Sequence, residues 1–159
     1  MSAHEHHYEI RIEWTGAREA GTATYASYGR DHVISDPEGR RPDIPGSADT
    51  TFRGDADRWN PEQLLLASAS ACHQLAYLHL CAVNKVVVKA YSDHAEGWMS
   101  TDATGNGRFT RIMLRPKVTI GAGSDAVMAM ELHHQAHEAC FIANSLNFPV
   151  EATPSIEIE

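Results

Sequence analysis

The sequence is poor in lysine and in long apolar runs. Three of its 13 basic residues are lysine, and 21 acidic residues give the 159-residue chain a formal net charge of −8. Such a chain repels phosphate backbones and anionic lipid headgroups, so we expect neither nucleic-acid nor membrane binding. No apolar run reaches the ~18 residues that span a bilayer, and the polar, histidine-rich start lacks the apolar core of an export signal. These absences predict a cytoplasmic protein.

Cysteine is scarce as well, with Cys72, Cys81 and Cys140 alone. A small, odd number argues against a structural disulfide framework, and cytoplasmic thiols stay reduced unless they are used chemically. On one helix, Cys81 faces away from Cys72 and lies about 13 Å further along the axis. A disulfide needs Cα atoms within about 7 Å, so these two cannot pair. We expect Cys81 to pack in a core or an interface.

Length and composition predict one domain over residues 1–159. Hydrophobic residues make up 43% and charged residues 21%, which are ordinary globular values, and neither a repeat nor a long linker is visible. Residues 1–7 are expected to be a disordered end. Residues 36–58 carry several prolines and glycines and predict a long loop, a kind of segment that is often functional.

A long helix is predicted from Pro61 to about Val83. Asn60 is a favoured N-cap, proline suits the first helical position, and Gln63 completes a capping-box pattern. Residues 64–72 contain no charged side chain, which predicts a helix buried on every side.

The other elements follow from local patterns. Residues 8–14 alternate apolar and polar side chains, as a half-buried strand does. A second helix is expected over residues 124–143. Further strands are expected over residues 21–28, 30–35, 86–91, 94–100, 109–120 (with Pro116 at an edge or bulge) and 153–158. This order predicts an α+β fold with mostly antiparallel sheets.

Two sets of side chains could carry chemistry. Cys72 lies in an apolar helix and is either a small buried hydrophobic residue or a reactive thiol. His133, His137 and Cys140 follow the spacing i, i+4, i+7. They could form a thiol activated by imidazoles, a zinc-type metal site, or a set of hydrogen-bonded interior or interface histidines. The spacing alone leaves these alternatives open.

Three segments together resemble the OsmC/Ohr family of osmotically inducible and organic-hydroperoxide-resistance proteins. Residues 60–73 (NPEQLLLASASACH) resemble its central-helix motif, and residues 137–146 (HEACFIANSL) its second cysteine motif. Arg18, after the turn at residues 15–17, resembles its early arginine. Phe141 and His73 differ from the hydroperoxide-specialised branch, so the chain resembles a broader OsmC-like branch. The resemblance implies antiparallel sheets around a long buried central helix, a second helix, and an intertwined dimer.

The resemblance also implies a thiol-based peroxidase, an antioxidant stress-response oxidoreductase that reduces organic hydroperoxides to alcohols. Cys72 would be peroxidatic and Cys140 resolving, with Arg18 stabilising the thiolate and Glu62 pairing with Arg18. An external thiol would reduce the disulfide, and no cofactor is required. The alternative is a non-enzymatic member of the fold that binds a small molecule or a metal (through His133, His137 and Cys140) or senses redox state.

Helix geometry adds an expectation about assembly. Glu62 and Cys72 are ten residues apart, or about 15 Å along one helix, and point in different directions. If both serve one site, as the resemblance implies, Glu62 and Arg18 come from a partner chain. We therefore expect an obligate homodimer with two composite sites at its interface.

Overall fold

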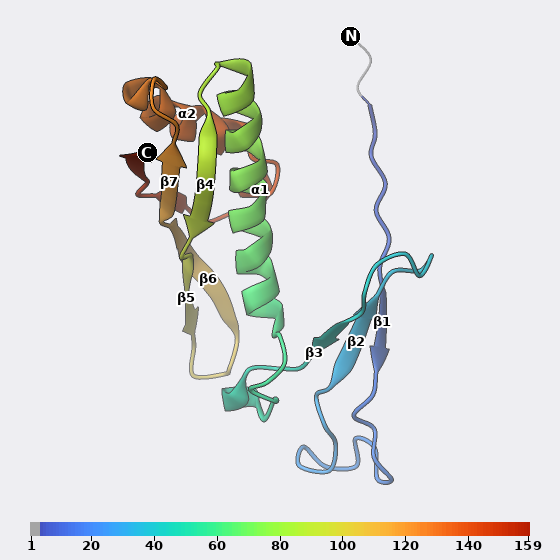
Figure 1. Ribbon diagram of the computed structural model, residues 1–159. Coiled ribbons are helices and arrows are strands. Elements are labelled where there is room, and N and C mark those ends of the chain that lie inside the picture. The colour runs from blue at the N-terminus through green and yellow to red at the C-terminus, as the bar shows by residue number, and fades with distance from the viewer. Residues whose placement is uncertain (1–3) are drawn as a thin grey trace. The chain divides into compact units, whose positions relative to one another are not determined.

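The computed structural model describes residues 4–159, which divide into two compact units, one up to Leu64 and one from Leu65 to Glu159 (Figure 1). Residues 4–7, in the segment predicted to be disordered, are exposed and belong to neither a helix nor a strand. Residues 1–3 of that segment lie outside the described residues.

Helix α1 (Pro61–Val83) has the predicted start and end. Its capping box is reciprocal: the Asn60 side chain accepts from the Gln63 amide at 2.8 Å, and the Gln63 side chain accepts from the Asn60 amide at 3.1 Å. Its fully buried residues fall at four-residue steps, a single stripe made of Ala69, His73, Tyr77 and Cys81.

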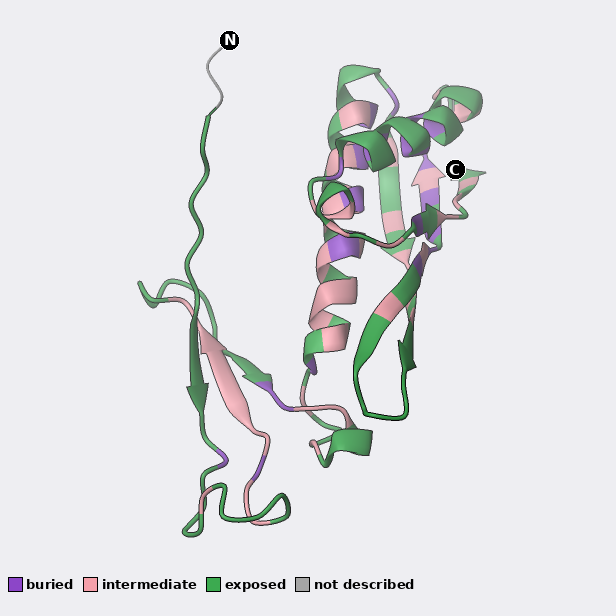
Figure 2. Ribbon diagram, turned by 180° about the vertical axis from the view of Figure 1, so that it is seen from behind, coloured by how far each residue is buried: buried purple, intermediate pink, exposed green. Residues whose placement is uncertain are grey.

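The other faces of α1 are partly open within one chain, so the prediction of a helix buried on every side was wrong for the single chain (Figure 2). Within residues 64–72, Ala67 and Ala71 are exposed. By length and composition α1 could also cross a membrane, but the core helix of a folded domain passes the same test. Its buried stripe packs within the second unit, as a core helix does.

Two three-stranded sheets form the rest of this unit with α1 and α2. One has the order β4-β7-β9 and the other β5-β6-β8. Their strands are β4 (Val88–Asp93), β5 (Glu96–Thr101), β6 (Gly107–Leu114), β7 (Pro116–Ile120), β8 (Val150–Ala152) and β9 (Ser155–Ile158). The β6/β8 and β7/β9 pairs are parallel and the β4/β7 and β5/β6 pairs antiparallel.

The predicted strand at residues 109–120 is in fact two strands in different sheets. The chain leaves β6 after Leu114 and starts β7 at Pro116, which suits the first position of a strand because proline has no N–H to donate. The short strand β8 was not predicted.

Helix α2 (Ala126–Ala139) is shorter than predicted at both ends. The Asp125 side chain caps it by accepting from the amides of Val127 and Met128 at 2.9 and 3.0 Å. At its end Cys140 adopts an extended conformation, and a 3₁₀ turn, η2 (Ala143–Ser145), follows.

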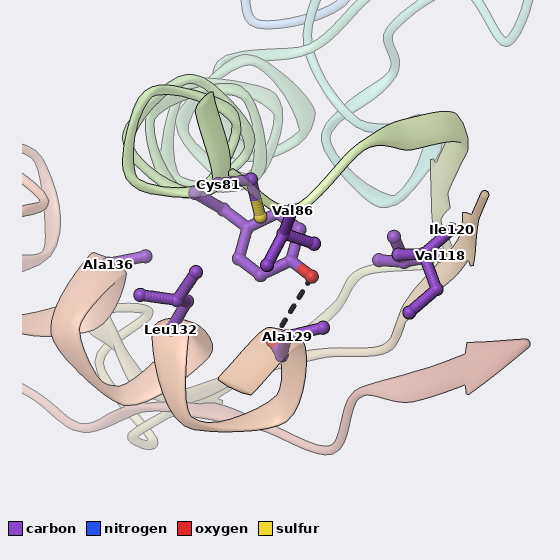
Figure 3. Packing of buried hydrophobic residues seen from close by; sticks show 8 residues of the cluster. Cys81, Val86, Val118, Ile120, Ala129, Leu132 and Ala136 are labelled. Atoms are coloured by element: carbon purple, nitrogen blue, oxygen red, sulfur yellow. Dashed lines mark hydrogen bonds between the residues drawn. The ribbon is translucent and has the colours of Figure 1, made fainter. Parts of the chain in front are cut away.

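The main core lies where α1 and α2 meet β7 (Figure 3). Tyr77 donates its hydroxyl to the Ala129 carbonyl at 3.1 Å and so ties the two helices together. Cys81 packs in this core, as predicted, and is 1% exposed. The cluster consists of Tyr77, Cys81, Val86, Val118, Ile120, Ala129, Leu132 and Ala136.

The first unit holds an antiparallel sheet in the order β1-β2-β3, made of β1 (Arg11–Trp14), β2 (His32–Ser35) and β3 (Ile44–Gly46). All four residues of β1 are exposed, so it is not half-buried as predicted (Figure 2). The predicted loop at residues 36–58 contains β3 and a 3₁₀ turn, η1 (Thr50–Phe52). Across the described fold, four strand pairs are antiparallel and two parallel, which confirms the α+β prediction.

The predicted strand at residues 21–28 is wrong: these residues form turns. The Ser27 hydroxyl donates to the Gly21 carbonyl at 2.7 Å, which folds the segment back on itself. The Arg30 guanidinium lies over the rings of Tyr25 and Tyr28, 4.3 and 4.0 Å from their centroids, which is the geometry of a cation–π interaction. These short-range contacts outweigh the β propensity of the aromatic residues.

Candidate functional site

Two thiols from distant parts of the sequence lie near enough to influence each other in the second unit. Cys72 lies on α1 and is partly exposed, whereas Cys140 caps the end of α2 and is 1% exposed. Burial raises the pKa of the Cys140 thiol; the Ala143 amide, 3.5 Å from the sulfur, opposes this, and the adjacent Cys72 thiol adds to it. Cys140 is therefore a protonated, shielded thiol at neutral pH beside a more accessible one.

Arg18 sits in a turn of the first unit, in the left-handed conformation with φ 51°. The base of this turn closes where the Gly29 amide donates to the Gly16 carbonyl at 2.7 Å. A Cβ on Gly16 would collide with the Gly29 carbonyl, so the turn requires glycine there. Arg18 and the two thiols belong to different units.

Glu62 lies in the first turn of α1, where the helix dipole favours an anion. Its Oε2 atom is buried and has no hydrogen-bond partner within residues 4–159. A buried carboxylate oxygen without a donor is costly, so this carboxylate requires a cation or donor. Because α1 runs without a break, Glu62 lies about 15 Å along the axis from Cys72.

A buried pair of histidines, one of which directly follows Cys72 on α1, was not predicted from the sequence. His73 on α1 and His133 on α2 join ring to ring, with Nε2 of His73 3.0 Å from Nδ1 of His133. The His133 ring also stacks on Tyr77, with centroids 3.8 Å apart. The available signal was the four-residue spacing of His73 and Tyr77, which puts both on the buried stripe of α1.

The three alternatives for His133, His137 and Cys140 can now be compared with this geometry. His133 is a hydrogen-bonded interior histidine, while His137 is exposed on the same helix. Over residues 4–159, no three His, Cys, Asp or Glu side chains gather closely enough to hold a metal ion. The predicted metal set is therefore not brought together, because His133 is directed to His73.

The fold is α+β, with one free thiol on a long central helix and a second at the end of the following helix. The family described as OsmC-like protein matches residues 54–155. The chain belongs to the OsmC-like family. The match extends over the end of the first unit, all of α1 and most of the second unit.

Several solved structures have a similar fold. An OsmC-like protein of unknown function from Vibrio cholerae is 27% identical, with a TM-score of 0.83 over 95% of this chain and 100% of that one. The organic hydroperoxide resistance protein OsmC of Legionella pneumophila is 20% identical, with a TM-score of 0.67 over 96% and 99%. OhrB of Bacillus subtilis, also an organic hydroperoxide resistance protein, is 19% identical, with a TM-score of 0.60 over 96% and 98%. No curated protein matches the sequence.

Proposed function

We propose that this chain is a cytoplasmic thiol-dependent peroxidase that reduces organic hydroperoxides to alcohols. The observation that carries the proposal is the meeting of Cys72 and Cys140, an accessible thiol beside a buried one, in an OsmC-like fold. Structural neighbours named as organic hydroperoxide resistance proteins support the substrate class.

The chemistry follows from the two thiols. The Cys72 thiolate attacks the terminal oxygen of the hydroperoxide; a sulfur–oxygen bond forms, the O–O bond breaks, and the alcohol leaves after taking up a proton. Cys72 is then a sulfenic acid. Cys140 attacks that sulfur, the disulfide forms, and the hydroxyl leaves as water with the Cys140 proton. An external dithiol returns two electrons and two protons.

The raised pKa of Cys140 suits a resolving role. A buried, protonated thiol does not compete with Cys72 for peroxide, because the thiolate is the nucleophile. It becomes reactive only when a sulfenic sulfur is held against it. We assign Arg18 the role of stabilising the Cys72 thiolate, and Glu62 that of holding Arg18.

We further propose a homodimer of single OsmC-like domains in which Glu62 and Arg18 of one chain complete the site of the other. Two observations support this: Glu62 has an unpartnered buried oxygen, and α1 separates it from Cys72 of its own chain. The family match, which crosses the boundary between the two units, supports treating both as one domain.

The test of function is consumption of cumene hydroperoxide with a dithiol reductant. Cys72→Ser should abolish it, and Cys140→Ser should allow one turnover that leaves Cys72 oxidised. Cys81→Ser is the matched control, because Cys81 lies in the core away from Cys72, and should keep most of the activity. Sustained turnover by Cys72→Ser would refute the assignment; one oxidation of the parent without turnover would indicate a redox sensor.

The test of the composite site mixes two inactive variants. Glu62→Ala and Cys72→Ser protomers, exchanged under mild denaturant, should restore about one working site per heterodimer if the site is shared between chains. No recovery in a verified heterodimer would show that Glu62 and Cys72 act within the same chain and would refute the composite site.

A further inference from the structure

Besides the apolar core, three links that involve a polar atom or a sulfur join α1 to α2 and its cap, and the His73–His133 pair is the middle one. Tyr77 reaches Ala129, His73 reaches His133, and Cys72 lies beside Cys140. The contacts run in opposite order along the two helices. The histidine pair is therefore the polar link nearest to the thiols.

Both imidazole rings are buried away from solvent, and each makes one hydrogen bond. His73 and His133 are 1% and 3% exposed. Their outer nitrogens, Nδ1 of His73 and Nε2 of His133, have no hydrogen-bond partner within residues 4–159. The inner nitrogens therefore make the single hydrogen bond of each ring, and that bond ties α1 to α2 at this level.

We propose that the His73–His133 hydrogen bond is a positioning element that holds Cys140 against Cys72 for disulfide closure. His73 directly follows Cys72 on α1, and His133 lies on α2, whose C-cap residue is Cys140. Neither imidazole touches the hydroperoxide in this scheme. The inference rests on the proposed resolving role of Cys140 but concerns geometry, so it can be tested without peroxide.

Amide side chains give a position-specific test. Glutamine places its amide where Nε2 of histidine lies, and asparagine places it where Nδ1 lies. His73→Gln and His133→Asn should therefore keep the link, whereas His73→Asn and His133→Gln move the amide away from its partner. A purely space-filling role would not distinguish these pairs.

The quantity to measure is the effective concentration of the Cys72 and Cys140 thiols relative to each other. It is obtained from the equilibrium in which the protein dithiol and oxidised glutathione give the protein disulfide and two molecules of reduced glutathione. We expect His73→Asn and His133→Gln to lower it about tenfold or more, since a buried group loses its partner. His73→Gln and His133→Asn should stay within about threefold of the parent. Tyr77→Phe, which removes the more distant link, and His134→Gln, on the exposed face of α2, are the controls and should change it least.

Equal effective concentrations in all four folded histidine variants would overturn the proposal. If the displaced-amide variants do not fold, ¹⁵N NMR of the parent decides: a coupling between Nε2 of His73 and Nδ1 of His133 supports the link, and its absence refutes it. A parent that closes the disulfide with glutathione but ignores cumene hydroperoxide would refute the proposed function while leaving the positioning role intact.

Discussion

The two units bury their apolar side chains very differently. The second unit encloses Tyr77, Leu132 and Ile120 with no measurable exposure. In the first unit, the buried residues among those described are small or polar, namely Gly16, Gly29, Gly46, Ser47 and Asn60. The second unit thus has a core of its own, whereas the first unit leaves its large apolar side chains partly or fully exposed.

The register of the first sheet shows where this surface lies. Ile12 pairs with Ile34, and Ile34 pairs with Ile44, so the three side chains share one face. Ile12 remains 60% exposed. A sheet with one apolar face is stable when that face packs against other side chains, and we expect the second copy in the proposed homodimer to cover this face.

The largest effect should come from the core of the second unit. Leu132→Ala removes a fully buried side chain and should lower the free energy of unfolding by about 2–5 kcal/mol. Val127→Ala, on an exposed position of the same helix, should change it by less than about 0.5 kcal/mol. Urea denaturation at two protein concentrations measures both, and the loss in Leu132→Ala should not depend on concentration.

A charge on the first sheet should act through assembly instead. Ile12→Asp costs the isolated chain little because the side chain is exposed, but it places a carboxylate in the proposed interface. We expect the dimer dissociation constant to rise about a hundredfold, measured by analytical ultracentrifugation. Glu13→Gln, on the opposite face of β1, is the control. A parent that is monomeric at micromolar concentration would contradict the homodimer.

The buried histidines should make the stability of the second unit sensitive to acid. Burial lowers the pKa of His133 from 6.5 to about 3. Burial also lowers the pKa of His73; the charge of Asp93 opposes this shift and that of His137 adds to it. Below pH 6.5 the unfolded chain binds more protons than the folded one, so stability is complete above that pH and falls as the pH drops.

The contribution of His133 to this loss of stability can be measured by comparing the parent with a variant that lacks the histidine. Each such histidine contributes a slope of up to about 1.4 kcal/mol per pH unit. His133→Asn removes one of them, so its stability should fall less steeply than that of the parent between pH 6.5 and 5. Urea titrations across this range measure the slopes, in which carboxylates common to both proteins cancel. Parallel curves would show that His133 is not buried as a neutral imidazole.

Sequence patterns predicted local features and missed those that depend on distant contacts. The start of α1 was predictable because Asn60 and Gln63 cap each other within one turn. Residues 21–28 were predicted as a strand from their β propensity, although short-range contacts of Ser27 and Arg30, which alternation does not reveal, fold them into turns. The meeting of Cys72 with Cys140 was implied by resemblance, while the His73–His133 pair needs the register of α1 against α2, which neither segment encodes alone.

The smallest effect we predict concerns the helix shared by both units. Asn60→Ala removes the side chain that accepts the Gln63 amide and should cost about 1 kcal/mol. Asn84→Ala, at the other end of α1, removes an exposed hydrogen bond to the Leu80 carbonyl and should cost less than about 0.5 kcal/mol. Hydrogen exchange should show faster opening of the first turn, which carries Glu62, with unchanged protection around Leu132. Because Glu62 would then be held less firmly while Cys72 keeps its surroundings, peroxidase activity should fall more in Asn60→Ala than in Asn84→Ala. Equal activity in the two variants would indicate that the order of the first turn of α1 does not matter to the site.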